Sequence, residues 1–513
     1  MSNKPVIAGT ILSYISLAVQ SVATIVITPF IIINLGDEAF GVYKIATSLI
    51  GYLGILNFGF GNAAIKYLTE IKMHGTLDKE KEFLSMIKLL NLAAVILSLV
   101  AGLVIYNLIP TIFAQSFSSS EISLARQLFI ILIFSMAVNI VNDIYVAILN
   151  VHERFVFLKG LDLFKNVLRV VLILAILTFS DSAVVLTIID LLLSIIVFVC
   201  SVAFCDRKLQ TRPKYSFRVL KTIHWPYYKE VIIYSSYYFL NLIVSQLIWN
   251  TDSIIIGMRR SSFDAAVYGA GANISNAFYS LSLVVGVLMF PRVVRLVSSG
   301  ASKEQLTNTM IKLGRMQAFL AFFIVTVYFA CGKQFVSLWL GDRYMEAWTT
   351  SLLVMIGSLF PSITVTGQLI LRAINKQKFY LLSYLVIFLI NAVITYLVVV
   401  KYGIVGGAFV TLISFIIGVV FMIMPHYKKT IGINTKLFFI KMLPQIVISA
   451  AVGIAFYFIY TRIQINTWGS LILSVIVYAA VYYSLIYFTL TTKDEKLALK
   501  RQIEKWSHKL KPN

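Results

Sequence analysis

The sequence is short of charge and short of cysteine. Only 13% of its 513 residues are charged, about half the share usual in soluble proteins, while 59% are hydrophobic. Such a chain cannot supply the polar surfaces of a soluble multidomain enzyme, and it is too hydrophobic to be disordered. Its three scattered cysteines, Cys200, Cys205 and Cys331, are too few for a disulfide scaffold. The composition therefore predicts an all-α protein that crosses a membrane many times.

Long apolar stretches fill the chain in place of charge. A helix needs roughly 20 mostly apolar residues to cross the hydrocarbon core, and fourteen stretches satisfy this. They are residues 6–34, 43–65, 84–108, 122–149, 156–179, 183–205, 231–257, 265–290, 316–332, 348–371, 380–400, 404–425, 438–460 and 469–490. The first is too long for the core of a signal peptide, so we expect it to remain as an uncleaved helix.

Acidic residues are also scarce, with 22 Asp and Glu against 44 Lys and Arg and a net charge of +22. Most basic residues fall in alternate connections and in the two tails, and this alternation stays in phase along the chain. Because cytoplasmic loops collect Lys and Arg, both termini are predicted to be cytoplasmic. Anionic lipids of the inner leaflet account for the excess, so no nucleic acid partner is expected. The outer connections, no longer than about 15 residues, leave no room for a catalytic domain, and we do not expect an enzyme.

The longest connection suggests how the chain is organised. We predict two six-helix lobes around a central cavity, followed by two additional helices. The predicted parts are a first lobe (1–205), a basic cytoplasmic connector (206–229), a second lobe (230–425), the additional helices (426–490) and a cytoplasmic tail (491–513). The tail is typical of an amphipathic helix lying on anionic inner-leaflet lipids, with a plain solvated tail as the alternative.

The two lobes share a faint internal repeat. The segment TPFIIINLGDEAFGVYKIATSL resembles TDSIIIGMRRSSFDAAVYGAGANIS, with Val42–Tyr43 matching Val267–Tyr268. A weaker likeness relates residues 183–190 to residues 407–414. Parallel repeats with a binding site between them are a transporter architecture, whereas chance similarity among isoleucine-rich segments is the alternative.

Charged residues inside predicted spans are the strongest local signal, because each is costly in lipid unless it faces water or a partner. Asp162, Lys165 and Arg169 follow the spacing i, i+3 and i+7, which places them on one face of the fifth span. This face predicts a cationic wall for an anionic substrate such as a pyrophosphate, with Asp162 steadying Lys165. An interhelical ion pair that only orients helices is the alternative.

Three other carboxylates lie at membrane depth: Asp143, Asp190 and Asp252. Desolvated carboxylates can exchange protons or bind Na⁺, which would couple transport to an ion gradient. Balancing Lys165 and Arg169 is the rival role, and it is favoured slightly for Asp143 and Asp190. No cofactor is expected apart from this coupling H⁺ or Na⁺.

Amide side chains add polarity to the spans. Gln20, Asn57, Asn273 and Asn276 could bind sugar hydroxyls in a wet cavity, although hydrogen bonds between helices explain most such residues. The segment GFGNAA fits a dinucleotide pattern only superficially, because it ends a span and follows no strand, and close helix packing explains it better. No P-loop or zinc motif occurs in the sequence.

Several segments together resemble a known family. They are LGDEAFGVYKIATSLIGYLGILNFGFGNAAIKYLTE (35–70), WNTDSIIIG (249–257), FPRVVRL (290–296), LWLGDRY (338–344) and GIVGGAFVTLIS (403–414). Their order is similar to that of the polysaccharide-transport branch of the multidrug/oligosaccharidyl-lipid/polysaccharide flippase superfamily. The likeness covers nearly the whole chain.

The resemblance implies a flippase of the bacterial inner membrane. It would move oligosaccharide units linked to undecaprenyl pyrophosphate outward by alternating access, for O-antigen, capsule or exopolysaccharide, alongside polymerase and chain-length proteins of the same pathway. By position, Arg169 and Lys165 would face the headgroup, Arg292 would lie at the inner gate and Asp252 would be the carboxylate of the seventh span. Rival functions are an ion-coupled drug or cation antiporter and a non-transporting subunit of a glycan assembly complex.

Overall fold

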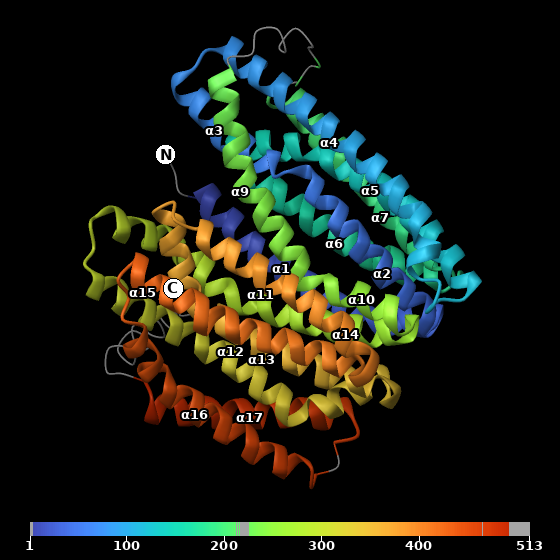
Figure 1. Ribbon diagram of the computed structural model, residues 1–513, viewed down its shortest axis with the longest axis vertical. Helices are drawn as coiled ribbons and strands as arrows, with labels where there is room; N and C mark the ends of the chain where they lie inside the picture. Colours follow the sequence, from blue (N-terminus) through green and yellow to red (C-terminus); the bar gives the residue numbers. More distant parts are fainter. Residues whose placement is uncertain (1–3, 212, 214, 216–224, 464, 492–513) are drawn as a thin grey trace, which may run out of the picture. The chain divides into compact units, whose positions relative to one another are not determined.

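A computed structural model describes residues 4–211, 213, 215, 225–463 and 465–491, and these residues contain helices and no strand (Figure 1). The α-helices are α1 (Lys4–Leu35), α2 (Asp37–Leu53), α3 (Phe60–His74), α4 (Leu77–Ile112), α5 (Ser119–Val151), α6 (Phe155–Leu177), α7 (Ala183–Arg207), α9 (Trp225–Trp249), α10 (Thr251–Arg259), α11 (Ser262–Ser298), α12 (Lys303–Leu340), α13 (Met345–Ala373), α14 (Lys378–Ile416), α15 (Met424–Thr430), α16 (Thr435–Tyr460) and α17 (Trp468–Thr489). Short 3₁₀ turns, η1 (Gly54–Asn57) and η2 (Asp342–Tyr344), and a π-helix, η3 (Ile417–Ile423), connect some of them. The all-α fold is confirmed.

The lengths of these helices fit a protein that crosses a bilayer repeatedly. In the described part of the chain, 10 helices are long and apolar enough to span, or up to 11 when the bent α11 is included. Each of the fourteen predicted segments lies largely in helical parts of the structure, while the number of spans, fourteen, stays a prediction. The tail predicted to be an amphipathic helix lies outside the described residues, as does most of the connector between residues 212 and 224.

The helices begin where the sequence provides caps. Ser118 and Ser302 each cap a helix in a capping box, in which side chains satisfy backbone N–H groups that the first turn leaves unpaired. Thr76 and Asn434 also accept hydrogen bonds from N–H groups of the first turns of α4 and α16. These polar caps fix the ends of helices that are otherwise apolar for most of their length.

A break between η1 and α3 explains the glycine-rich segment GFGNAA. Phe58 and Gly59 both have positive φ angles, of 54° and 68°. A Cβ atom on Gly59 would also lie 2.5 Å from the Cβ of Tyr238 in α9, so only glycine fits there. The segment is therefore a helix break packed against a neighbouring helix, which agrees with the packing interpretation of the sequence.

A second glycine divides α14. Gly403 has φ 65° and ψ −163°, which interrupts the helical backbone between two stretches that the sequence predicts as separate spans. The positive φ angle is accessible to glycine at no steric cost. The long helical run from Lys378 to Thr430 thus contains two apolar segments joined at a sharp bend.

The chain forms two compact units. Unit 1 contains residues 1–277 and 378–414, and unit 2 contains residues 278–377 and 415–513. In unit 1, α1 packs along α6, and α5 packs against α2, α4 and α7; in unit 2, α12 packs against α13, α16 and α17. The predicted division into two repeated lobes, separated by the basic connector, stays a prediction.

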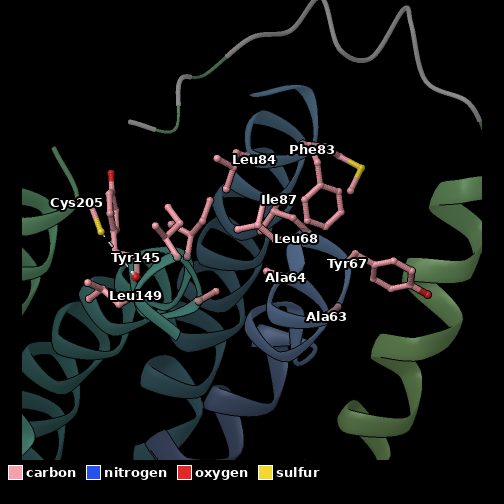
Figure 2. Close-up of a cluster of buried hydrophobic side chains, with 14 of the residues drawn as sticks. Ala63, Ala64, Tyr67, Leu68, Phe83, Leu84, Ile87, Tyr145, Leu149 and Cys205 are labelled. Atoms are coloured by element: carbon pink, nitrogen blue, oxygen red, sulfur yellow. Dashed lines mark hydrogen bonds between the residues drawn. The ribbon is translucent and has the colours of Figure 1, made fainter. Parts of the chain in front are cut away.

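One end of unit 1 is fixed by a buried cluster of apolar side chains (Figure 2). Leu68 of α3, Ile87 of α4 and Leu149 of α5 are fully buried there, and Cys205 brings the end of α7 into the same cluster. Relative to exposure to water, burial of such a side chain contributes about 1.5–3 kcal/mol. The cluster thereby holds α7, which carries Asp190, in a fixed register against α5.

Candidate functional site: a polar cavity between α1 and α6

The polar face predicted on the fifth span lines a cavity in unit 1. The cavity has a volume of about 600 Å³ and lies between α1 and α6, with one residue of α7. Its lining residues are Ser13, Ser16, Gln20, Ala23, Thr24 and Ile27 of α1, Lys159, Asp162, Lys165, Asn166, Arg169 and Val170 of α6, and Asp190 of α7. Hydroxyl and amide groups thus face a wall that carries three cations.

Arg169 is held at the cavity by a bidentate ion pair. Its Nε donates to Asp190 Oδ1 at 2.5 Å, and one terminal nitrogen donates to Asp190 Oδ2 at 3.2 Å. The same nitrogen donates to the Tyr43 hydroxyl at 3.0 Å, and Tyr43 donates to Asp190 Oδ2 at 3.3 Å. The side chains of Arg169 and Asp190 keep exposures of 29% and 21%, so water and solutes in the cavity can reach them. The ion pair is the contact that a charge-balancing Asp190 would make, and its role in transport stays a prediction.

Lys165 is the cavity cation without a carboxylate partner. Lys159 Nζ lies 3.0 Å from Asp162 Oδ2, so Asp162 pairs with Lys159 rather than steadying Lys165 as expected. Both alternatives are three residues from Asp162 along α6, and sequence spacing alone does not choose between them. In the described residues, no carboxylate oxygen lies within ion-pair distance of Lys165, which leaves its charge available to an anion in the cavity.

A second polar network lies beside the first. Lys44 Nζ of α2 donates to Asn273 Oδ1 of α11 at 2.7 Å, and Asn273 Nδ2 donates to Thr28 Oγ1 of α1 at 3.3 Å. Thr28 in turn donates to the backbone oxygen of Thr24, a cavity residue, at 2.6 Å. Asn273, predicted to bind sugar hydroxyls, here binds a lysine and a threonine instead.

Asp252 belongs to a separate buried site in unit 1. Its Oδ2 accepts hydrogen bonds from Tyr268 and Thr411, each at 2.7 Å, and the residue is 4% exposed. Asn391 donates to Thr411 at 3.2 Å and to Ser414 at 3.0 Å. Within the described part of the chain, Oδ1 of Asp252 has no hydrogen-bond partner. The repeat matches Tyr268 to Tyr43, and both tyrosines donate to an intramembrane carboxylate.

The remaining predicted residues lie elsewhere. Asn57 donates a short hydrogen bond to Asp143, and neither residue lines the cavity. Asn276 is half-buried in α11 and also does not line it. Arg292 is exposed in the part of α11 that belongs to unit 2. No three His, Cys, Asp or Glu side chains are grouped as metal ligands in the residues that the structure describes.

Of the predicted site residues, the structure therefore brings Gln20, Asp162, Lys165, Arg169 and Asp190 together in one cavity. Sequence reasoning missed Lys159 and Asn166 in the cavity wall, and Tyr43 and Lys44, which do not line the cavity but bond to groups next to it. Asn166 could have been found from its position beside Lys165. Tyr43 did not stand out among the 27 tyrosines of the sequence, although it belongs to the dipeptide Val42–Tyr43 that matches Val267–Tyr268.

Comparisons with known proteins agree on one family. Residues 6–297 match the family described as polysaccharide biosynthesis protein. A putative O-antigen transporter of Shigella flexneri is 21% identical over 416 residues, covering 79% of this chain and 93% of that protein.

Solved structures show a shared fold. The lipid II flippase MurJ in an inward closed conformation aligns with a TM-score of 0.72 and 18% identity, covering 95% of this chain and 100% of that one. An inward-facing multidrug resistance transporter of the MATE family aligns with a TM-score of 0.66 and 13% identity, covering 82% and 99% of the two chains. The family match, the fold and the apolar helices together describe a multi-pass membrane protein. The chain belongs to the polysaccharide biosynthesis protein family, in the polysaccharide-transport branch of the multidrug/oligosaccharidyl-lipid/polysaccharide flippase superfamily.

Proposed function

We propose that the protein is a flippase for oligosaccharides linked to undecaprenyl pyrophosphate. It would move them from the cytoplasmic to the outer leaflet of the bacterial inner membrane by alternating access, with both termini cytoplasmic. One observation carries the proposal: a cationic wall faces a wall of hydroxyl and amide groups across the cavity of unit 1.

The charges of the cavity favour an anionic headgroup. Three cations, Lys159, Lys165 and Arg169, face two carboxylates, Asp162 and Asp190, so the lining carries an excess positive charge. A pyrophosphate would receive charge-assisted hydrogen bonds from Lys165 and from the planar guanidinium of Arg169. Placing these cations at membrane depth is costly, which is why such groups in spans mark substrate paths.

The opposite wall suits sugars. Ser13, Ser16, Gln20 and Thr24 of α1 offer hydroxyl and amide groups, and Asn166 adds another amide from α6. Groups of this kind both donate and accept hydrogen bonds, as sugar hydroxyls do. The volume of about 600 Å³ falls within the range of about 300–1,000 Å³ found for small-molecule sites.

An ion-coupled drug or cation antiporter shares this fold, but the cavity does not favour it. Both of its carboxylates, Asp162 and Asp190, are already paired with Lys159 and Arg169. A cationic drug would have to displace one of these partners. The name of the Shigella relative, a putative O-antigen transporter, and that of the structural neighbour, a lipid II flippase, also favour a lipid-linked glycan as substrate.

The buried Asp252 is proposed to couple transport to H⁺ or Na⁺. Its Oδ1 lacks a hydrogen-bond partner in the described residues, and three hydroxyl- or amide-bearing side chains, Tyr268, Thr411 and Asn391, surround the site. Oxygen ligands of this kind suit a proton or a small hard cation. Polymerase and chain-length proteins of the same glycan pathway are the proposed partners.

Deletion of the gene in the source bacterium tests the function. We expect loss of surface polysaccharide and accumulation of lipid-linked repeat units in the inner membrane. Complementation with Arg169→Gln should fail, whereas Lys401→Gln, which removes an exposed cation outside the cavity, should restore export. Normal surface polysaccharide in the deletion strain would refute the proposal, and drug sensitivity with normal polysaccharide would favour the antiporter.

A further inference from the structure

Lys44 is a further cation of unit 1 that does not line the cavity. It lies in α2, half-buried, one residue after Tyr43, whose hydroxyl bonds both Arg169 and Asp190. Its Nζ donates to Asn273 at 2.7 Å. Through Asn273 and Thr28 it is connected to the α1 wall of the cavity.

The neutral partner of Lys44 is unusual for a cation inside a membrane bundle. In the part of the chain that the structure describes, no carboxylate lies within ion-pair distance of Lys44. Its ammonium group also lies 5.4 Å from the ring centroid of Phe40, a weakly favourable cation–π contact. An ammonium has three donors, and the amide of Asn273 occupies one of them. Ionisable groups inside membrane bundles usually pair with one another or with backbone carbonyls, whereas the hydrogen bond of Lys44 goes to a neutral side-chain amide.

The predicted repeat pairs this lysine with a glycine. When Val42–Tyr43 is matched with Val267–Tyr268, Lys44 corresponds to Gly269. A Cβ atom on Gly269 would lie 2.9 Å from Lys44 Cγ, so glycine at this position leaves space for the lysine stem. At this contact, one predicted repeat has a cation and the other has no side chain.

We propose that Lys44 is a second binding station for the anionic phosphate of the headgroup, which receives it after Arg169 and Lys165 release it. Asn273 is a positioning residue that holds the lysine side chain until the phosphate arrives. This inference rests on the proposed function. It extends the binding site from the cavity to α2 and assigns Lys44 to transit of the substrate rather than to its initial capture.

The choice of an amide over a carboxylate fits this role. A hydrogen bond to a neutral amide is weaker than an ion pair, so a phosphate can take Lys44 from Asn273 but could less readily take it from an aspartate. A path through a membrane also needs several binding sites of moderate strength, because one very strong site would retain its ligand. Arg169 is held by Asp190, and Lys44 is held by Asn273. Each cation can therefore bond again to its protein partner once the phosphate has left.

Complementation of the deletion strain tests the inference. At equal membrane abundance, we expect Lys44→Gln to export less than about a tenth of the wild-type amount of polysaccharide, and Lys44→Arg at least about half. Asn273→Asp keeps the lysine and the shape of the site but gives Lys44 a carboxylate partner. We expect it also to fall below about a tenth, because the lysine is then held too strongly.

Binding by purified protein separates transit from capture. The probe is the lipid-linked repeat unit extracted from the deletion strain. Lys44→Gln should bind it within about twofold of wild type, whereas Arg169→Gln should bind it more than about tenfold more weakly. Wild-type export by Lys44→Gln or Asn273→Asp would overturn the inference, and so would a loss of binding in Lys44→Gln as large as that in Arg169→Gln. If the deletion strain accumulates no lipid-linked units, the proposed function fails and the inference fails with it.

Discussion

Replacing Asp190 by asparagine separates the two roles of Arg169. In the folded protein, the carboxylate of Asp190 accepts two hydrogen bonds from Arg169 and one from Tyr43. Asparagine keeps the size of the side chain but removes its charge and one acceptor. Arg169 then loses its counterion while it stays hydrogen-bonded to Tyr43.

The cost to stability can be bounded from the exposure of the pair. Breaking a fully buried ion pair costs about 3–5 kcal/mol, because a buried charge is left uncompensated. Arg169 and Asp190 are 29% and 21% exposed at the cavity, so water screens part of this loss. We therefore expect Asp190→Asn to lower the free energy of unfolding by about 2 kcal/mol. The melting temperature should fall by a few °C.

The same change should strengthen headgroup binding. A phosphate that enters the cavity of the wild-type protein competes with Asp190 for the guanidinium of Arg169. In Asp190→Asn this competitor is absent, and we expect the affinity for the lipid-linked repeat unit to rise about tenfold, which corresponds to about 1.4 kcal/mol. Export should nevertheless fall, since the ligand leaves Arg169 more slowly.

Asp162→Asn is the matched control. Asp162 lines the same cavity, but its ion pair with Lys159 is more exposed, with side-chain exposures of 49% and 39%. Exposed pairs contribute about 0–1 kcal/mol, so this variant should melt close to wild type. Melting of the purified variants in detergent and titration with the extracted repeat unit provide both measurements. If Asp190→Asn melts like Asp162→Asn, or binds the repeat unit more weakly than wild type, the assignment of Asp190 as a competing counterion is refuted.

Three further predictions concern other parts of the molecule. Gly367→Ala should destabilise the protein by about 1–3 kcal/mol, seen as a lower melting temperature, because the added Cβ would lie 2.3 Å from the ring of Tyr427; an unchanged melting temperature would contradict this packing. Asn57→Ala should also lower the melting temperature, by the equivalent of about 1–3 kcal/mol, since the carboxylate of Asp143 loses its amide donor, whereas Asn57→Ser should be milder. Asp252→Asn should reduce export while repeat-unit binding is kept, and transport in vesicles should no longer respond to pH or Na⁺ gradients; wild-type transport under every gradient would exclude coupling at this residue.

Helical periodicity was sufficient to predict that Asp162, Lys165 and Arg169 share one face of α6, and all three line the cavity. Lys165 and Arg169 follow Asp162 at helical spacing, and a charged face cannot point at lipid, so periodicity predicts which face of this helix points inward. The residues on other helices to which these side chains bond could not be predicted in this way. The bond between Arg169 and Tyr43 joins positions 126 residues apart, and periodicity within one helix contains no information about which other helix lies opposite.

Lys44 shows why predictions from hydropathy are least accurate at the ends of helices. The predicted span begins at residue 43, which leaves Lys44 at its very edge, next to an outer connection. In the structure, α2 begins at Asp37, because two acidic residues in its first turn stabilise the N-terminus and Gly36, with φ 83°, ends the preceding helix. The lysine is thus inside a helix that starts before the hydrophobic stretch does. Hydropathy locates the apolar part of a helix, whereas caps and glycines locate its ends.

The fit between Lys44 and Gly269 has a consequence for how relatives of this protein can diverge. The two residues lie in different repeats but share one volume, so a larger residue at position 269 would require a shorter one at position 44. Among homologues we expect these two positions to covary in size. A chimera that joins the first half of one homologue to the second half of another should work only when both parents agree at this pair. Substrate range could then change through loop and cavity residues, while this pair is inherited as a unit.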